Sequence, residues 1–161
     1  MVKFFLLTVA CAMLGGCAIQ TLQLGATQEE VLARYGKPSA VVALPSGTRL
    51  QYSLQPSGQS AVMVDLDAAG KVASVRQVLN PADFARVAVG QWTRADALRE
   101  FGPPASIDHV YAWTGDILTY RWLDVGQSMY FYIYLDPNNV VQRTGQGMQF
   151  YRDDVWSLWR R

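Results

Sequence analysis

The chain carries one pattern of residues twice, and this duplication constrains its fold more than any other feature of the sequence. The segments Thr27–Pro38 and Thr93–Pro104 share a threonine, an acidic residue three positions later, an apolar stripe, and a closing glycine and proline. These features predict a short helix with an N-terminal capping box and a C-terminal stop. A period of about 66 residues is too long for a solenoid and indicates two copies of a small module.

The correspondence continues beyond each predicted helix. Gly47–Tyr52 corresponds to Gly115–Tyr120, and Val62–Asp67 corresponds to Phe131–Asp136. Apolar and polar residues alternate in these segments, and turn-forming residues separate them, which predicts antiparallel strands. The predicted fold class is therefore α+β, with two tandem helix-plus-antiparallel-sheet repeats followed by a short C-terminal helix.

The N-terminus has the pattern of an export signal that ends at a cysteine. After Lys3 comes an apolar run of about 11 residues, which suits a signal peptide and falls short of the roughly 20 residues that span a membrane. Leu14–Gly16 followed by Cys17 resembles the lipobox of bacterial lipoproteins. The resemblance implies cleavage between Gly16 and Cys17 and acylation of the Cys17 thiol. An ordinary secretory signal with a chance cysteine is the alternative.

The residue after the cysteine bears on the location of the protein. Ala18 stands where an aspartate would resemble the inner-membrane retention signal of Gram-negative lipoproteins. The predicted location is therefore the outer membrane, through the N-terminal lipid, with the protein facing the periplasm. The predicted parts are a signal peptide at 1–16, a tether at 17–24, a first repeat at 25–79, a linker at 80–89, a second repeat at 90–150 and a helical tail at 151–161.

Composition limits the chemistry available to the mature chain. Cys11 leaves with the leader and the Cys17 thiol would carry lipid, so no disulfide can form and stability must come from an apolar core. Half of the residues are hydrophobic, which is enough for such a core. Lys3 is the only charged residue of the leader, so the mature chain holds equal numbers of basic and acidic residues. This balance argues against nucleic acid as a partner.

The repeated motifs suggest a family. Each copy contains a Tyr/Phe-Gly-x-Pro end to its helix, a glycine before Leu-x-Tyr, and a strand that ends in Leu-Asp before a turn and a valine. This pattern resembles the SmpA/OmlA (BamE-like) outer-membrane lipoproteins, and the tandem arrangement resembles the β-lactamase inhibitor protein fold. The family carries one copy and this chain carries two, with Trp92 inserted before the second. The resemblance implies a non-catalytic protein-interaction module in cell-envelope assembly or maintenance.

One strand of the second repeat places three tyrosines on the side opposite its predicted core residues. They are Tyr130, Tyr132 and Tyr134, and Arg121 is expected on the same side of the neighbouring strand. Tyrosine gives large, rigid contact area with a polar tip and is common at interfaces. These four residues are the predicted partner-binding candidates. The alternative is that this side packs against the other repeat, the linker or the tail.

The tail Asp153–Arg161 has acids at its start and bases at its end, which suits a short helix. Val155, Leu158 and Trp159 share one stripe of that helix. The tail is predicted either to anchor a partner or the membrane interface, or to cover the sheet.

Residues for catalysis are scarce. His109 is the only histidine, predicted within a strand from Ile107 to Trp113, and no His/Cys cluster has the spacing of a metal site. Asp67 and Asp136 form a pair of equivalent acids, but each opens a turn, where its side chain can bond the backbone. We therefore expect no enzyme activity, no cofactor, no metal and no small-molecule substrate.

Two functions fit these features. The first is a lipid-anchored interaction module that binds an envelope protein. The second is an inhibitor or sequestering partner of a periplasmic hydrolase, as the inhibitor-like tandem pattern suggests. Such an inhibitor needs an exposed loop, and the turns at Pro45–Gly47 and Trp113–Gly115 are the two candidates.

Overall fold

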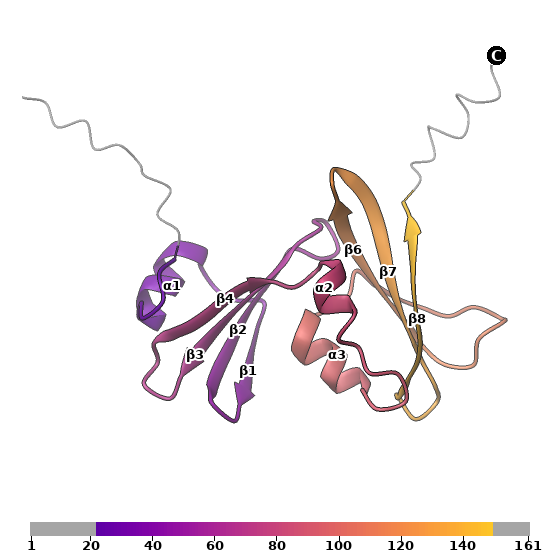
Figure 1. Cartoon of the computed structure of the whole chain (residues 1–161), viewed down its shortest axis with the longest axis horizontal. Helices are drawn as coiled ribbons and strands as arrows, with labels where there is room; N and C mark the ends of the chain where they lie inside the picture. The colour runs from indigo at the N-terminus through magenta and orange to yellow at the C-terminus, as the bar shows by residue number, and fades with distance from the viewer. Residues whose placement is uncertain (1–21, 150–161) are drawn as a thin grey trace, which may run out of the picture.

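The computed structural model describes residues 22–149 (Figure 1). The predictions for the signal peptide, for Gly16 and Cys17, for most of the tether and for the tail at 151–161 lie outside the described residues.

Two four-stranded antiparallel sheets of the same strand order make up most of the described chain (Figure 1). The first sheet has the order β1 (Ala40–Leu44), β2 (Gly47–Ser53), β3 (Ala61–Asp67) and β4 (Val72–Gln77). The second has the order β5 (Ser106–Asp108), β6 (Ile117–Asp124), β7 (Gln127–Leu135) and β8 (Val141–Met148). The helices are α1 (Gln28–Tyr35), α2 (Pro81–Phe84) and α3 (Arg94–Phe101).

The predicted α+β class of two helix-plus-sheet repeats is wrong, because the structure is mostly antiparallel β and only 16% helical. The two longest described helices have eight residues each. A helix of that length extends about 12 Å at 1.5 Å per residue. A strand of nine residues such as β7 extends about 30 Å. Helices this short make up little of the structure beside the eight strands of the described chain, although their end signals in the sequence are clear.

Capping boxes begin α1 and α3, as the sequence predicts. The Thr27 hydroxyl accepts a hydrogen bond from the Glu30 N–H, and the Glu30 carboxylate accepts one from the Thr27 N–H. Thr93 and Asp96 make the same pair of bonds. The hydrogen bond from the threonine backbone lowers the pKa of both Glu30 and Asp96. Each helix start is therefore fixed by residues three positions apart.

The shared glycine and Leu-x-Tyr motif has the same structural role in both sheets. Gly47 and Gly115 have positive φ, and a Cβ on either would collide with a strand carbonyl, that of Leu66 or Leu135. The Tyr52 hydroxyl donates to the Gly36 carbonyl at the end of α1. The corresponding Tyr120 hydroxyl donates to the Gly102 carbonyl at the end of α3. The motif thus ties each strand to the end of the helix before it.

Helix α3 lies between the two sheets (Figure 1). On one side Ala97 and Phe101 pack into the core of the second sheet. On the other side the Gln51 amide of β2 donates to the carbonyls of Leu98 and Arg99, both at 2.9 Å. The same core cluster includes Met63 of the first sheet. The two sheets therefore share one helix and one core.

Arg49 of β2 completes this contact from a buried position, with 5% of its surface exposed. Its guanidinium donates to both oxygens of Asp65, at 2.6 and 3.0 Å, and to the Arg99 carbonyl at 3.0 Å. It also lies 3.2 Å from the Glu100 carboxylate. Burial alone would raise the pKa of Asp65, but the hydrogen bonds from Arg49 hold it below its usual value. One cation thus joins the first sheet to α3.

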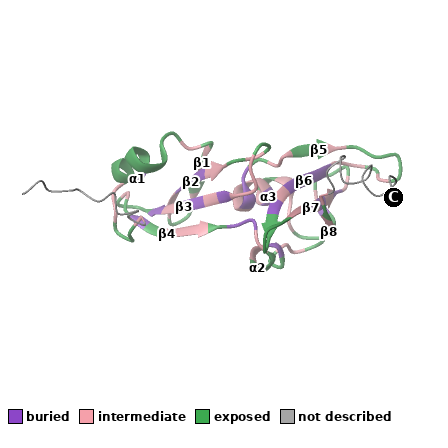
Figure 2. Cartoon of the chain, turned by 90° about the horizontal axis from the view of Figure 1, so that it is seen from above, coloured by how far each residue is buried: buried purple, intermediate pink, exposed green. Residues whose placement is uncertain are grey.

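Both sides of the first sheet are therefore covered. On the side of α3 and the second sheet, the buried residues are Arg49, Gln51, Ala61 and Met63. Figure 2 shows the buried residues along β2, β3 and β6, in the middle of the molecule, while α1 and β5 are more exposed. The opposite side of this sheet packs on α1 through Val31, which has no exposed surface.

We predict that Arg49→Leu lowers the free energy of unfolding by about 3 kcal/mol, because it leaves two carboxylates in a largely buried site without their cation. Arg76→Leu is the matched control, since its ion pair with Asp83 is more exposed and is expected to contribute about 1 kcal/mol or less. Urea unfolding of both variants, followed by circular dichroism, measures the difference. Equal losses in the two variants would contradict the central role of Arg49.

Candidate functional site

The strongest candidate for a binding site is the side of the second sheet that points away from α2 and α3. We call it the tyrosine face, and it comprises Trp113, Tyr130, Tyr132, Tyr134 and Arg143. In β7 the residues between the tyrosines, such as Phe131 and Ile133, are buried in the core on the other side. The three tyrosines are partly exposed. The alternation in the sequence correctly predicted that they share one side.

The aromatic rings of this face form a continuous row. The ring centroids of Tyr130 and Tyr132 are 5.9 Å apart, and those of Tyr132 and Tyr134 are 6.4 Å apart. Trp113 meets Tyr134 edge to face at 5.2 Å. The guanidinium of Arg143 lies 3.9 Å from the centroid of the Tyr134 ring. These separations are typical of favourable aromatic and cation–π contacts, so the row is ordered before any partner binds.

Strand β8 has glycines, and so no side chains, at two positions beside this row. It is the last strand of its sheet, and Gly145 and Gly147 lie opposite Tyr132 and Tyr130 in the register. A Cβ added at Gly147 would lie 3.5 Å from the Tyr132 ring. The glycines thus leave the tyrosine rings uncovered along the edge of the sheet, where a side chain from β8 would otherwise stand.

The corresponding side of the first sheet packs against a helix. The correspondence of β3 with β7 places Ala61, Met63 and Asp65 where β7 has its tyrosines. Ala61 and Met63 have no exposed surface, because α3 packs over them. Figure 1 draws α2 and α3 on the inner side of the second sheet, and no helix among residues 22–149 on its outer side. Among residues 22–149, the tyrosine face therefore lacks the helix that covers the corresponding side of the first sheet.

The electrostatics of the face follow from its packing. Burial raises the pKa of Tyr132, and the neighbouring tyrosines and the Asp108 carboxylate raise it further. Asp108 is held in place by the Thr119 hydroxyl, which donates to it at 2.6 Å. The Tyr132 phenol thus keeps its proton, and can donate a hydrogen bond, over a wider pH range than a free tyrosine.

Arg121 lies at the border of the tyrosine face, opposite Tyr130 in the register. Its guanidinium donates to the Pro56 carbonyl at 2.7 Å and to the Gln149 side chain at 3.2 Å. Its backbone exchanges two hydrogen bonds with the Gln55 amide. Arg121 therefore fastens the loop between β2 and β3 to the second sheet, and its Nε and Nη1 donors bond within the chain.

The groups considered for catalysis are dispersed. His109 lies after β5 in an exposed loop, 3.2 Å from Asp116, so the predicted strand from Ile107 to Trp113 is wrong beyond Asp108. The carboxylates of Asp67 and Asp136 each accept two backbone N–H groups in their turns, as predicted. Within residues 22–149, no three His, Cys, Asp or Glu side chains are grouped to hold a metal ion. None of the described helices is long and apolar enough to cross a membrane.

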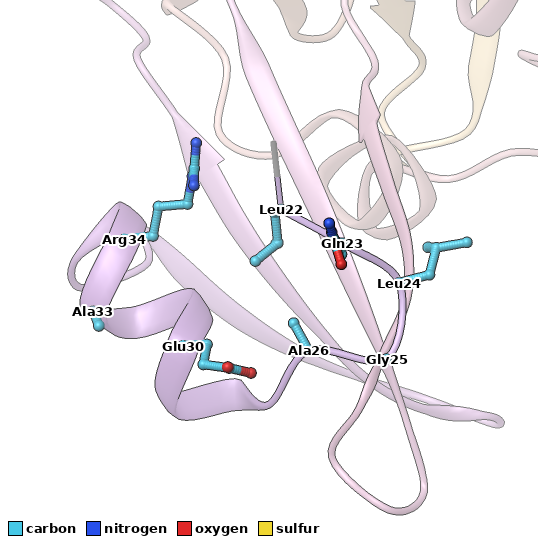
Figure 3. Close-up of a pocket in the computed structure, with 8 residues that line it drawn as sticks. All are labelled: Leu22, Gln23, Leu24, Gly25, Ala26, Glu30, Ala33 and Arg34. Atoms are coloured by element: carbon cyan, nitrogen blue, oxygen red, sulfur yellow. The ribbon is translucent and has the colours of Figure 1, made fainter. Parts of the chain in front are cut away.

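A groove of about 920 Å³ lies between α1 and the segment that precedes it (Figure 3). Its lining includes the apolar Leu22 and Ala26 and the charged Glu30 and Arg34. The Glu30 carboxylate already caps α1 through the Thr27 N–H. The lining contains no histidine, cysteine or hydroxyl group, and its one carboxylate is that of Glu30, which is held in the capping box.

The two turns considered for an inhibitory role differ in structure. Pro45 and Ser46 form a tight turn between β1 and β2, and Gly47 is the first residue of β2. In the other, the Trp113 indole donates to the Leu135 carbonyl at 2.8 Å and packs on Tyr134, so it belongs to the tyrosine face. Tyr111 of the same loop is fully exposed. Sequence reasoning missed Trp113 and Arg143 as members of the face, although the alternation in β8 offers a signal for Arg143.

Comparison with known proteins gives little information. No family model matches the chain, and no curated protein matches it. One solved structure that resembles it is YjgB, a DUF4309 family protein from Bacillus subtilis, at 15% identity and a TM-score of 0.30. The alignment covers 77% of this chain and 79% of that one. A resemblance this weak supports no argument about function.

We predict that Tyr132 ionises above pH 10, the usual value for a tyrosine. The absorbance titration of the native protein minus that of Tyr132→Phe isolates this phenol, and its midpoint should lie above pH 10. Asp108→Asn should move the midpoint down, because it removes a nearby negative charge. The raised pKa also implies that Tyr132 lowers stability only above pH 10, where the unfolded chain ionises first. A midpoint at or below 10 would contradict the described packing.

Proposed function

We propose that the chain is a lipid-anchored outer-membrane lipoprotein that serves as a non-catalytic protein-interaction module in cell-envelope assembly or maintenance. In this proposal the tyrosine face binds an envelope protein. The observation that carries it is the ordered row of partly exposed aromatic rings, on a side whose counterpart in the first sheet binds α3. The resemblance of the sequence motifs to the SmpA/OmlA (BamE-like) lipoproteins also supports this class of function.

The chemistry of the tyrosine face suits protein binding. Tyrosine and tryptophan contribute large contact areas at a small cost in conformational entropy, and each has a polar group for hydrogen bonding. Strands β6 and β8 hold the backbone of β7 on both sides, so the row binds as a preformed surface. Arg143 adds a cation that is already stacked on Tyr134. Binding of this kind requires no cofactor, metal or small-molecule substrate.

In this proposal the lipid determines where the protein lies in the cell. Acyl chains on Cys17 would hold the module at the outer membrane, since each buried methylene contributes about 0.8 kcal/mol. A short tether then raises the effective concentration of the module for partners in the same membrane, to the millimolar range for flexible linkers. A tyrosine face of moderate affinity is sufficient under these conditions.

Tyr132→Ala tests the binding face, because Tyr132 is the centre of the row. We expect about 30-fold weaker binding, which is the effect of losing a contact of about 2 kcal/mol at the centre of an interface. The measurement is cross-linking in intact cells followed by recovery of the lipoprotein and quantification of attached envelope proteins. Tyr111→Ala is the matched control, since Tyr111 is exposed on a separate loop.

Recovery that is unchanged when all three tyrosines are replaced would exclude the tyrosine face. The alternative function, inhibition of a periplasmic hydrolase, has one structural feature in its favour, the exposed Tyr111 loop. It gains support if Tyr111→Ala alone abolishes recovery and the attached protein is a hydrolase.

Cys17→Ser tests the anchor. We expect the variant to lose incorporation of labelled palmitate and to leave the membrane fraction, because the serine hydroxyl cannot form the thioether on which acylation of such a lipoprotein depends. Cys11→Ser is the matched control, since Cys11 lies within the predicted signal peptide and should leave both properties unchanged. Palmitate incorporation that persists in Cys17→Ser would show that the lipobox prediction is wrong.

A further inference from the structure

We propose that the outer edge of β8 binds an extended segment of the partner protein as an added antiparallel strand, whose large side chains contact the tyrosine rings. The inference rests on the proposed function, because it names the conformation and side-chain pattern of the partner that the tyrosine face binds. Three features of residues 22–149 support it: the unpaired backbone of β8, two glycines beside the tyrosine rings, and the position of Arg143.

The register of β8 determines which of its backbone groups face the outer edge. The Gln149 N–H donates to the Ser128 carbonyl, in continuation of the pairing between β8 and β7. Every second residue of an antiparallel pair bonds its neighbour in this way, so Thr144, Gln146 and Met148 direct their N–H and C=O groups to the open edge. Within residues 22–149 these groups have no hydrogen-bond partner. β8 is also the longest of the four edge strands.

The chain itself adds extended backbone to the start of this edge. The Val141 N–H donates to the Trp92 carbonyl at 2.8 Å, and the Val141 carbonyl accepts from the Gly90 N–H at 2.7 Å. The chain then enters α3 at Arg94 and leaves the edge. The stretch 144–148 that follows contains neither proline nor a charged residue, which are common means of protecting a strand edge. It can therefore accept a further strand.

Gly145 and Gly147 determine which side chains an added strand needs. A Cβ on Gly147 would lie 3.5 Å from the Tyr132 ring and 3.7 Å from its hydroxyl oxygen, so this ring leans over β8 toward the edge. The corresponding positions of the first repeat hold Arg76 and Val78. An added strand lies about 4.8 Å from β8, so large side chains opposite the glycines meet the tyrosine rings directly. The partner therefore needs large side chains at two alternate positions.

Arg143 extends this pattern by one position. It lies on the same side as the glycines, is exposed, and stacks on Tyr134. In an antiparallel partner strand, the residue opposite Arg143 comes two positions after the residue opposite Gly145. Opposite charges attract across paired strands, so an acidic residue is expected there. The complete pattern is large, any, large, any, acidic.

A second copy of this chain fits the edge less well than such a segment. In a symmetric pairing of two β8 strands centred on Gln146, Gly145 of one copy lies opposite Gly147 of the other. Neither glycine has a side chain to reach the tyrosine rings, so both gaps stay unfilled. The observations therefore favour a partner strand with large side chains.

Amide hydrogen exchange of the full-length protein, followed by NMR, tests the proposal with a synthetic peptide. In the peptide, two phenylalanines and one glutamate alternate with threonines in that order. At about nine-tenths occupancy it should slow exchange of the Thr144, Gln146 and Met148 N–H groups about tenfold, because only the free fraction exchanges. A peptide of the same composition with adjacent phenylalanines should not protect them. Absence of protection by the alternating peptide at its highest soluble concentration would overturn the proposal.

Gln146→Pro removes one outward-facing N–H and leaves the bonds between β8 and β7 in place. We expect about fivefold weaker peptide binding by fluorescence anisotropy, the effect of losing one hydrogen bond. Gln146→Thr keeps the N–H and is the matched control. If near-ultraviolet circular dichroism shows that Gln146→Pro is unfolded, Gly145→Ala/Gly147→Ala replaces it. Both Cβ atoms fit in ordinary contact with the tyrosine rings, and the methyl groups fill the space that the partner side chains need. Unchanged binding in the folded variant would contradict an added strand.

Exchange without peptide tests for other occupants of the edge. Protection of the three N–H groups that increases with protein concentration would show that a second copy binds there, and would overturn the proposal. Protection that is independent of concentration would show that the chain itself already occupies the edge, with the same consequence.

Recovery of cross-linked envelope proteins from cells separates this inference from the proposed function. Recovery that falls in both Tyr132→Ala and Gln146→Pro supports both. Recovery that falls in Tyr132→Ala and is unchanged in Gln146→Pro would overturn only the added strand. If the peptide protects the edge but recovery is unchanged when all three tyrosines are replaced, the edge accepts a strand and only the proposed function is overturned.

Discussion

The arrangement of the two sheets depends on the buried guanidinium of Arg49. Removing a cation from water is costly, and here the cost is offset by Asp65, Glu100 and the Arg99 carbonyl around it. Two of these partners belong to α3, which is part of the core of the second sheet. A hydrogen-bonded cation accepts few alternative geometries, so Arg49 fixes the position of α3 on the first sheet and, through α3, the position of the second sheet.

The second sheet has no ion pair at the positions that correspond to Arg49 and Asp65. The positions that correspond to Arg49 and Asp65 are Ile117 and Tyr134, which are directly paired in the register. This sheet cannot bind a helix through the same ion pair. It offers aromatic rings and phenol hydroxyl groups instead, with Arg143 stacked at one end. One backbone pattern therefore builds an internal contact in the first sheet and an accessible surface in the second.

Features that depend on neighbouring residues could be predicted from the sequence. The capping boxes at Thr27 and Thr93 and the turn bonds of Asp67 each involve residues no more than four positions apart. The predicted fold class was wrong, because two helices of eight residues make up little of a structure that is mostly antiparallel β. The burial of Met63 could not be predicted either, because α3, which packs over it, lies more than thirty residues further along the chain.

The candidate site also contains residues that the sequence predicts and one that it does not. Alternation within one strand places Tyr130, Tyr132 and Tyr134 on one side, whereas Trp113 reaches them from a separate loop that no local pattern describes. An aromatic face of this kind has a consequence for affinity. Under the proposed function, the lipid tether holds this face near partners in the same membrane and raises their effective concentration. The tether and the aromatic row then act together, because neither alone gives a selective contact there.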